Sequence, residues 1–256
     1  MGHNDGEPIL RIRGIGKVLD RKVVLDGLDL DIHRGETLVV IGRSGCGKSV
    51  LLKHITGLMK PDFGEILFED QDITQFSRKK LFEMRMRFGM LFQSSALFDS
   101  MSVGQNVSLP LRKHTGMGDG EIREIVADKL GLVGLTDVYD KFPSELSGGM
   151  KKRVGLARAV VMNPDVVLYD EPTTGLDPIM ADVINDLICG LQKELEITSV
   201  VVTHDIKSAY KVGDRIAMLY GGRIVFSGPP DEVRTTSDPV VRQFVEGRAE
   251  GPIKPL

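Results

Sequence analysis

The sequence predicts an α/β fold in which a largely parallel sheet carries an antiparallel β edge. Three observations lead to this prediction. Short apolar runs rich in β-branched residues recur at 38–41, 166–169 and 199–203, and helical patterns separate them. Such runs are typical of strands buried on both faces of a parallel sheet. Segments 9–13 and 28–32 instead alternate apolar and charged residues, which indicates half-buried strands at an edge.

Composition narrows the class of protein. The chain has 256 residues, of which 41% are hydrophobic and 27% are charged, so it holds enough apolar material for a sizeable core. The net charge of −3 argues against a nucleic-acid binder, and we expect no nucleic-acid partner. No apolar run approaches the length of about 18 residues that spans a bilayer. Residues 1–8 are polar and lack a signal-peptide core, so we expect the chain to stay in the cytosol.

A glycine-rich loop at 42–49 lies between the apolar run 38–41 and a segment with helical apolar spacing at 50–55. A strand, glycine loop and helix in this order predict a phosphate-binding loop, because glycines let backbone N–H groups converge on one anion. The helix N-terminus adds the positive end of its dipole. Lys48 would supply a charge for the β- and γ-phosphates, and the Ser49 hydroxyl would bind Mg²⁺. The predicted nucleotide contacts in this loop are Gly42, Ser44, Gly45, Cys46, Gly47, Lys48, Ser49 and Val50.

The two cysteines, Cys46 and Cys189, show no metal-ligand or redox spacing. Cys46 lies at a predicted helix N-terminus, where the pKa of a thiol tends to fall. Two interpretations stay open: a reactive thiol, or a residue that fills a loop position facing the nucleotide.

The remaining elements define three regions. A charged helix at 78–87 and a short apolar strand at 88–93 precede a mostly helical stretch, and Gly221-Gly222 predicts the turn of a late hairpin. We expect an α/β core with an antiparallel edge at 1–94 and 163–228, and a helical subdomain at 95–162. We expect a tail at 229–256 with one brief helix.

Two carboxylates follow the apolar run at 166–169. Asp170, at the strand tip, suits contact with Mg²⁺, and Glu171 points another way and could polarise an attacking water. An acidic strand end alone is weak evidence, but downstream of a phosphate loop it becomes strong.

A second glycine pair opens a second helix. Ser147 can cap this helix, and the bare backbone of Gly148 and Gly149 admits close approach of an anion. An ordinary Ser-capped helix explains the same residues equally well, so local physics leaves both interpretations open.

These motifs occur in the order seen in ABC ATPases, which the chain resembles over nearly its whole length. The matching residues are the phosphate loop, Gln93, 146–149, Asp170-Glu171, 175–177 and 203–205. The resemblance implies a P-loop NTPase fold of ABC type, with the signature motif 146–149 on the helical subdomain. It also implies binding and hydrolysis of ATP with Mg²⁺.

Roles for two further residues come from the same resemblance. Gln93 would lie near Mg²⁺ and the attacking water and would sense a membrane partner. His204 would contact the γ-phosphate and link it to Glu171. Taken alone, Gln93 is better explained as a surface amide and His204 as a strand-end histidine satisfied by a neighbour.

The resemblance further implies a head-to-tail dimer with two ATP molecules in the interface. Ser147, Gly148 and Gly149 would bind the ATP held by the second copy, and Asp177 would cross the interface. Many ABC ATPases stack adenine on an aromatic residue upstream of the phosphate loop. Here that region is Lys17-Val18-Leu19-Asp20, so adenine packing would be aliphatic, at Leu19 or Val18.

A finer resemblance is to the ATPases of the Mla/Mce lipid transport systems. Segments 90–98 and 143–150 are similar to that subfamily, including Met150 in place of the usual Gln of the signature. The resemblance implies phospholipid transport between inner and outer membranes, at the cytoplasmic face of the inner membrane. The implied partners are a permease dimer, an Mce-domain lipid-binding protein and a STAS-domain regulator.

Several other kinds of ABC protein share these ATPase motifs. The chain has no long coiled coil, second phosphate loop or membrane span, so it does not resemble chromosome-structuring, translation-type or half-transporter proteins. An importer ATPase for a small polar solute and a mechanotransmission ATPase that moves no cargo stay open. We also expect that Phe98, Met101, Val103 and Val107 line the groove for a permease helix, with core packing as the alternative.

Overall fold

The computed structural model describes residues 7–254, and the chain packs as two compact units. One unit combines the residues up to 81 with those from 200 onward, and the other contains 82–199. Helix α2 (Arg78–Arg85) and strand β8 (Thr198–Thr203) contain the points where the chain passes between units. The sequence-based division groups residues by role instead, and it stays a prediction. Its regions are the core at 1–94 and 163–228, the helical subdomain at 95–162 and the tail at 229–256.

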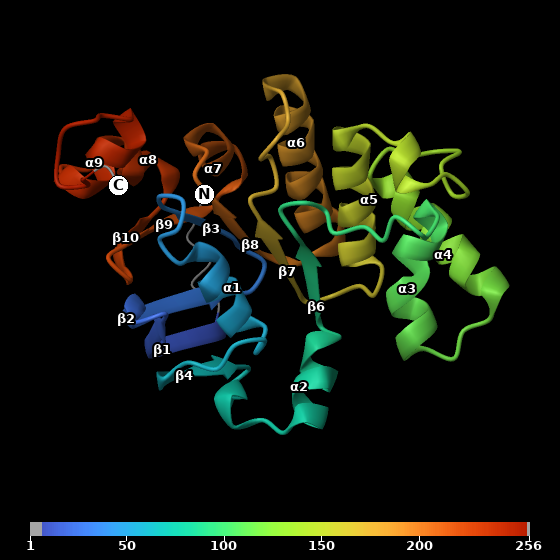
Figure 1. Ribbon diagram of the computed structural model, residues 1–256, viewed down its shortest axis with the longest axis horizontal. Helices are drawn as coiled ribbons and strands as arrows, with labels where there is room; N and C mark the ends of the chain where they lie inside the picture. Colours follow the sequence, from blue (N-terminus) through green and yellow to red (C-terminus); the bar gives the residue numbers. More distant parts are fainter. Residues whose placement is uncertain (1–6, 255–256) are drawn as a thin grey trace. The chain divides into compact units, whose positions relative to one another are not determined.

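The antiparallel edge of the first unit is a four-stranded sheet with the order β2-β1-β4-β5 (Figure 1). Its strands are β1 (Pro8–Leu19), β2 (Lys22–His33), β4 (Phe63–Phe68) and β5 (Gln71–Asp72). Asp20 and Arg21 both have positive φ and join β1 to β2 in a two-residue turn, whose twist matches that of the strands. The predicted alternating strands are therefore confirmed, and both are longer than expected.

A second sheet in the first unit positions the phosphate loop. Strands run in the order β10-β9-β3-β8, and β3 (Thr37–Ile41) is buried at every residue and parallel to β9 (Arg215–Tyr220). Strand β10 (Arg223–Gly228) returns through Gly221-Gly222, both at positive φ, as the predicted hairpin. Helix α1 (Lys48–Ile55) follows β3, η1 (Ile73–Gln75) follows β5, and α7 (Ile206–Val212) follows β8.

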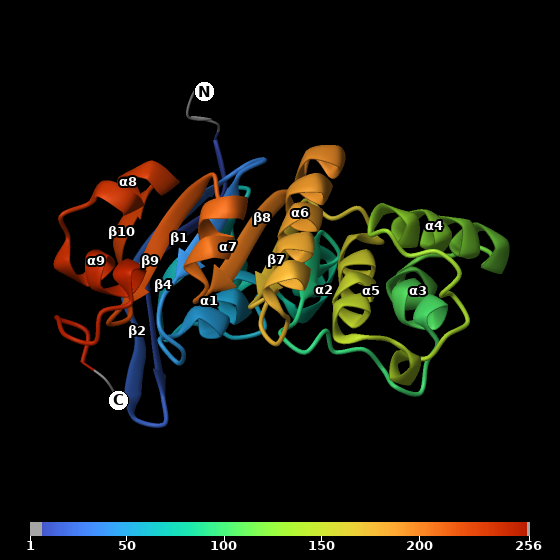
Figure 2. The same ribbon diagram turned by 90° about the horizontal axis from the view of Figure 1, so that it is seen from above.

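The second unit combines a parallel strand pair with helices. Strand β6 (Phe88–Leu91) pairs with β7 (Val166–Asp170), and a Cβ built on Gly89 would lie 2.1 Å from the Ala159 carbonyl oxygen. Only glycine therefore allows helix α5 to approach β6 so closely. Figure 2 shows α3, α4 and α5 gathered beside one another. The helices are α3 (Val103–His114), α4 (Asp119–Leu132), η2 (Pro143–Glu145), α5 (Gly148–Val160) and α6 (Pro178–Leu195).

The tail contains two helices, α8 (Pro230–Thr235) and α9 (Pro239–Glu246), so the expectation of one was wrong. The Asp238 carboxylate accepts hydrogen bonds from the N–H groups of Val240 and Val241 and so starts a separate second helix. The chain then folds back, because the Gln243 side chain pairs with both backbone groups of Ile253.

Within residues 7–254, no helix combines the length and apolar character needed to cross a bilayer.

Candidate functional site

The phosphate loop connects the end of β3 at Ile41 to the start of α1 at Lys48. Gly45 and Gly47 have φ values of 76° and 110°, which are unfavourable for residues with a side chain. Gly47 is the N-cap residue of α1, and no side chain caps this helix. The loop therefore presents backbone and a helix N-terminus, the arrangement that binds phosphate.

The Lys48 side chain is buried and folds back over the loop. Its ammonium group donates hydrogen bonds to the carbonyl oxygens of Gly42 (2.8 Å) and Arg43 (3.2 Å). A Cβ built on Gly42 would lie 2.6 Å from the Leu219 carbonyl oxygen and 2.7 Å from Cys46 Sγ. Cys46 thus packs closely against Gly42, which favours the interpretation that its thiol fills the loop.

The other residues predicted around this loop differ in exposure. Ser44 and Ser49 are exposed, and Val50 and Leu19 are partly buried, with Leu19 at the end of β1. His204 is exposed and lies between β8 and Asp205, which caps α7 by accepting from the N–H of Lys207. All of these residues belong to the first unit.

The two predicted catalytic carboxylates lie at the end of β7 in the second unit. Asp170 is the last residue of the strand, and Glu171 follows it with a φ of 48° and a nearly buried side chain. A left-handed conformation at a non-glycine residue is strained and persists only where its surroundings hold it. The Thr174 hydroxyl donates to Glu171 Oε2 at 3.3 Å and so holds the carboxylate end.

The signature residues have clear local roles. Ser147 is the N-cap of α5, and its hydroxyl accepts from the Met150 N–H at 3.3 Å. Gly149 leaves the backbone bare there, and a Cβ built on it would lie 2.4 Å from Cε, the flexible end of the Met180 side chain. The Asp177 carboxylate caps α6 by accepting from the N–H groups of Ile179 and Met180, each at 3.0 Å.

Gln93, two residues after β6, has an exposed side chain, and its carbonyl oxygen accepts a hydrogen bond from Lys152 Nζ at 2.6 Å. Lys152 lies on α5, is only 4% exposed, and also donates to the Glu171 carbonyl oxygen at 3.4 Å. Burial lowers the pKa of Lys152, against the opposing effect of the Asp170 and Glu171 charges. One side chain thus contacts the backbone of both Gln93 and Glu171.

Arg158 on α5 holds the segment after Gln93. Its guanidinium donates to the carbonyl oxygens of Ser95 (2.6 Å) and Ala96 (2.8 Å), and both of these residues have positive φ. Burial lowers the pKa of Arg158. Lys152 and Arg158 were not predicted as site residues from the sequence. The position of Lys152 could have been found from the sequence, because it shares a helical face with Gly149, Gly155 and Leu156. A charged side chain on such an apolar face is buried and needs hydrogen-bond partners inside the protein.

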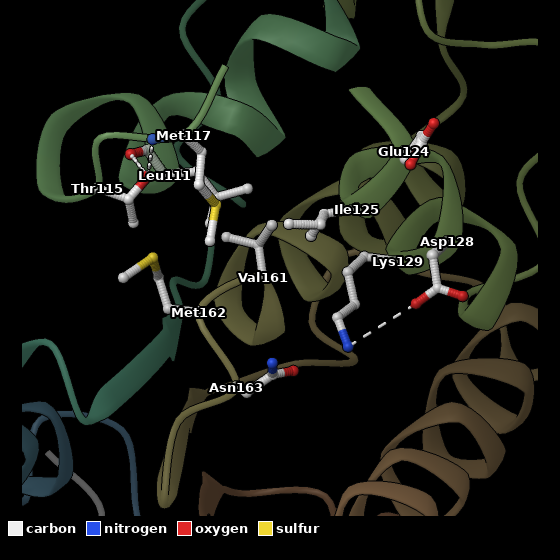
Figure 3. A pocket seen from close by; sticks show the side chains of 10 residues that line it. All are labelled: Leu111, Thr115, Met117, Glu124, Ile125, Asp128, Lys129, Val161, Met162 and Asn163. Atoms are coloured by element: carbon white, nitrogen blue, oxygen red, sulfur yellow. Dashed lines mark hydrogen bonds and ion pairs between the residues drawn. The ribbon is translucent and has the colours of Figure 1, made fainter. Parts of the chain in front are cut away.

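A pocket of about 440 Å³ lies among α3, α4 and the end of α5 (Figure 3). The side chains of Leu111, Met117, Val161 and Met162 gather on one side of it. Lys129 Nζ points toward the Asp128 carboxylate at a distance of 3.9 Å. None of the predicted nucleotide or catalytic residues lines this pocket, so it is separate from the candidate site.

Comparisons with known proteins agree with these motifs. A model of the ABC transporter family matches residues 25–174. The probable ribonucleotide transport ATP-binding protein mkl of Mycobacterium leprae is 44% identical over 244 residues, covering 95% of this chain and 70% of the relative. The intermembrane phospholipid transport system ATP-binding protein MlaF of Haemophilus influenzae is 42% identical over 233 residues, covering 91% and 88%.

A solved structure is similar in both fold and sequence. It is a dimeric ATP-binding cassette in a post-hydrolysis state bound to ADP and Pi, with a TM-score of 0.79 and 31% identity. The match covers 86% of this chain and 98% of that chain. With the glycine loop before α1 and the motifs of both units, these matches show that the chain belongs to the ABC transporter family and is an ATPase that binds and hydrolyses ATP.

Proposed function

We propose that the chain is the ATP-hydrolysing subunit of a transporter that moves phospholipid between the inner and outer membranes. The observation that carries this proposal is the 42% identity to MlaF across 91% of the chain. The Mla/Mce-like segments around Gln93 and Met150 support it. In this proposal the chain is a peripheral subunit at the cytoplasmic face of the inner membrane.

The proposed chemistry gives each of these motifs a role. The loop from Gly42 to Val50 binds the phosphates of ATP, with Lys48 on the β- and γ-phosphates, and Leu19 packs against adenine. Glu171 orients water for in-line attack, and His204 contacts the γ-phosphate. Such a reaction depends mainly on positioning and on stabilisation of charge.

Mg²⁺ fits the donors that the chain offers. The Ser49 hydroxyl, the Asp170 carboxylate and the Gln93 amide supply oxygen atoms, which Mg²⁺ prefers. No group of three or more His, Cys, Asp and Glu side chains in the part of the chain that the structure describes could hold a metal ion. Phosphate oxygens and water would therefore complete the coordination. Bound Mg²⁺ would neutralise charge on the β- and γ-phosphates.

Two copies would close head to tail around two ATP molecules. Ser147, Gly148 and Gly149 would bind the ATP of the second copy, since α5 begins there with a bare backbone. Asp177 would reach the interface from its capping position on α6. The dimeric state of the similar ADP-bound cassette supports this arrangement.

The proposed partners are a permease dimer, an Mce-domain lipid-binding protein and a STAS-domain regulator. A groove of about 360 Å³ in the second unit would receive apolar side chains of a permease helix, since its lining includes Phe82, Phe88, Met90 and Phe92. Phe98, beyond Gln93, is 50% exposed, whereas Val103 and Val107 are fully buried. Our expectation that those two valines line a docking groove was therefore wrong, because they pack in the core.

Changing Phe98 and Met101 together to Asp is expected to abolish co-purification of the permease while the chain still folds. Folding should survive because Asn106 holds this loop through backbone contacts with Phe98 and Met101, which the substitutions leave in place. Pull-down of the permease measures the effect. Val225→Asp, at an exposed apolar residue of β10, is the control. Undiminished co-purification of the Phe98 and Met101 variant would contradict a docking role for these two residues.

The proposed function is tested by extracting the tagged chain gently from its native membranes and identifying the proteins and lipids that accompany it by mass spectrometry. The tag belongs at the N-terminus, because a tag after Lys254 could disturb the phosphate loop. Arg43 of that loop donates a hydrogen bond to the Lys254 carbonyl oxygen at 2.5 Å. A permease, an Mce-domain protein and enriched phospholipid would support lipid transport. A solute-binding protein with its permease would favour the importer, consistent with the ribonucleotide transport name of the mycobacterial relative. A division or wall-remodelling partner without cargo would favour mechanotransmission.

A further inference from the structure

Lys152 occupies an unusual place for a charged side chain. It projects from α5, five residues after the signature serine, into the interior of the second unit. Its ammonium group donates to the backbone carbonyl oxygens of Gln93 (2.6 Å) and Glu171 (3.4 Å), which follow different strands, β6 and β7. A buried cation is tolerated only where such partners compensate for lost water. These two contacts therefore define where Lys152 lies.

The backbone conformation of Glu171 has to be held in place by other residues. Its φ of 48° is disfavoured for a residue with a Cβ, so the peptide would relax if nothing held it. Lys152 holds its carbonyl group and Thr174 holds its carboxylate. The side chain is thus constrained from both ends, as a group that must aim at one water molecule requires.

The same helix also fixes the loop after Gln93. Arg158 lies six residues after Lys152, about 9 Å further along the helix axis, and binds the carbonyl oxygens of Ser95 and Ala96. Both of those residues have positive φ, so this loop too is held in a conformation that it would not keep alone. Helix α5 therefore carries two cations that clamp the backbone beside both proposed catalytic residues.

We propose that Lys152 is a positioning residue for ATP hydrolysis, which aligns Glu171 and Gln93 by holding their backbone carbonyls to the signature helix. This inference rests on the proposed function, in which Glu171 orients water. It adds a direct link between α5, whose N-terminus would bind the ATP of the second copy, and the residues that handle water in the first copy's own site. Movement of α5 would then shift Glu171 and Gln93 together.

The test compares ATP hydrolysis by the full chain carrying Lys152→Met, Lys152→Arg or Lys151→Met. Lys152→Met keeps the length of the side chain and removes its donors, and we expect kcat to fall by about 10- to 100-fold, the scale of a misplaced catalytic group. The KM for ATP should change by less than about threefold, because Lys152 contacts neither the phosphate loop nor Leu19 and reaches Gln93 only through its backbone carbonyl oxygen. Lys152→Arg retains donors and should recover most of kcat, and Lys151→Met should match the wild type.

A double variant separates positioning from stability. If Lys152 acts through Glu171, then adding Lys152→Met to Glu171→Gln should leave the residual rate unchanged within about twofold, because residues that act as a unit are not additive. Full multiplication of the two effects would overturn the proposal. The proposal would also be overturned if Lys152→Met kept more than half of the wild-type kcat while Glu171→Gln was inactive. A Lys152→Met enzyme whose only change is a lower Tm would overturn it as well.

If Lys152→Met does not fold, Lys152→Gln takes its place, because its amide can still donate to one carbonyl. We then expect an intermediate kcat and the same lack of additivity, and a wild-type kcat would overturn the proposal. Failure of the role proposed for Glu171 gives a different result, because Glu171→Gln alone would then retain more than about a tenth of the wild-type rate.

Discussion

Replacing Glu171 by Gln is expected to lower the rate of ATP hydrolysis by about 100-fold or more, the typical contribution of a positioned general base. The amide has the same shape as the carboxylate and can still accept from Thr174, so the loop after β7 should keep its conformation. The variant loses the negative charge that would polarise the attacking water. Binding of ATP should remain, because the phosphate loop is untouched, and a closed dimer should accumulate.

Two measurements on the same variant check this expectation. Phosphate release under saturating ATP reports turnover, and light scattering with and without ATP reports the dimer. Glu194→Gln, which makes the same chemical change at an exposed position of α6, is the matched control and should behave as the wild type. If Glu171→Gln retains more than about a tenth of the wild-type rate, then Glu171 is not the main water-orienting base.

Replacing Lys48 by Met is expected to weaken ATP binding by about 10- to 100-fold, since hydrogen bonds to charged groups contribute about 1.5–3 kcal/mol. The ammonium group is held at the loop by the Gly42 and Arg43 carbonyls, where incoming phosphates would meet it. Met fills the same volume without charge. The loss therefore measures the contribution of the cation more than a change of packing.

Titration of the chain with ATP by calorimetry gives the dissociation constant directly. Lys53→Met, which removes an exposed lysine from the same helix, is the control and should bind as the wild type does. Thermal unfolding without nucleotide shows whether the loop variant is still folded. A Kd within threefold of the wild-type value, for a folded Lys48→Met protein, would contradict the proposed role of Lys48.

The phosphate loop, the buried strand before it and the late hairpin were predictable because their signals are local. Gly45, Gly47 and the pair Gly221-Gly222 stand where positive φ is needed, and the run 38–41 lies within a fully buried strand. The ATPase of ABC type was likewise predictable from the order of its motifs, and the family comparisons confirmed it.

Other features depend on contacts between distant segments, which the sequence does not display. The apolar residues Val103 and Val107 were consistent with either docking or core packing, and only the packing of α3 against α5 decides for the core. The contacts of Lys152 with Gln93 and Glu171 join three separate parts of the chain. The roles of the individual site residues stay predictions, which the variants described above test.

The positive φ of Glu171 has a consequence for protein engineering. A glycine at position 171 would relieve the backbone strain, so a screen that rewards heat resistance alone would tend to favour replacing the proposed catalytic residue. Stability and turnover are opposed at this one position. Stability is better increased at a glycine inside a helix where neither the backbone conformation nor close packing requires glycine. Gly190, exposed within α6 with open space around its Cα, is such a position.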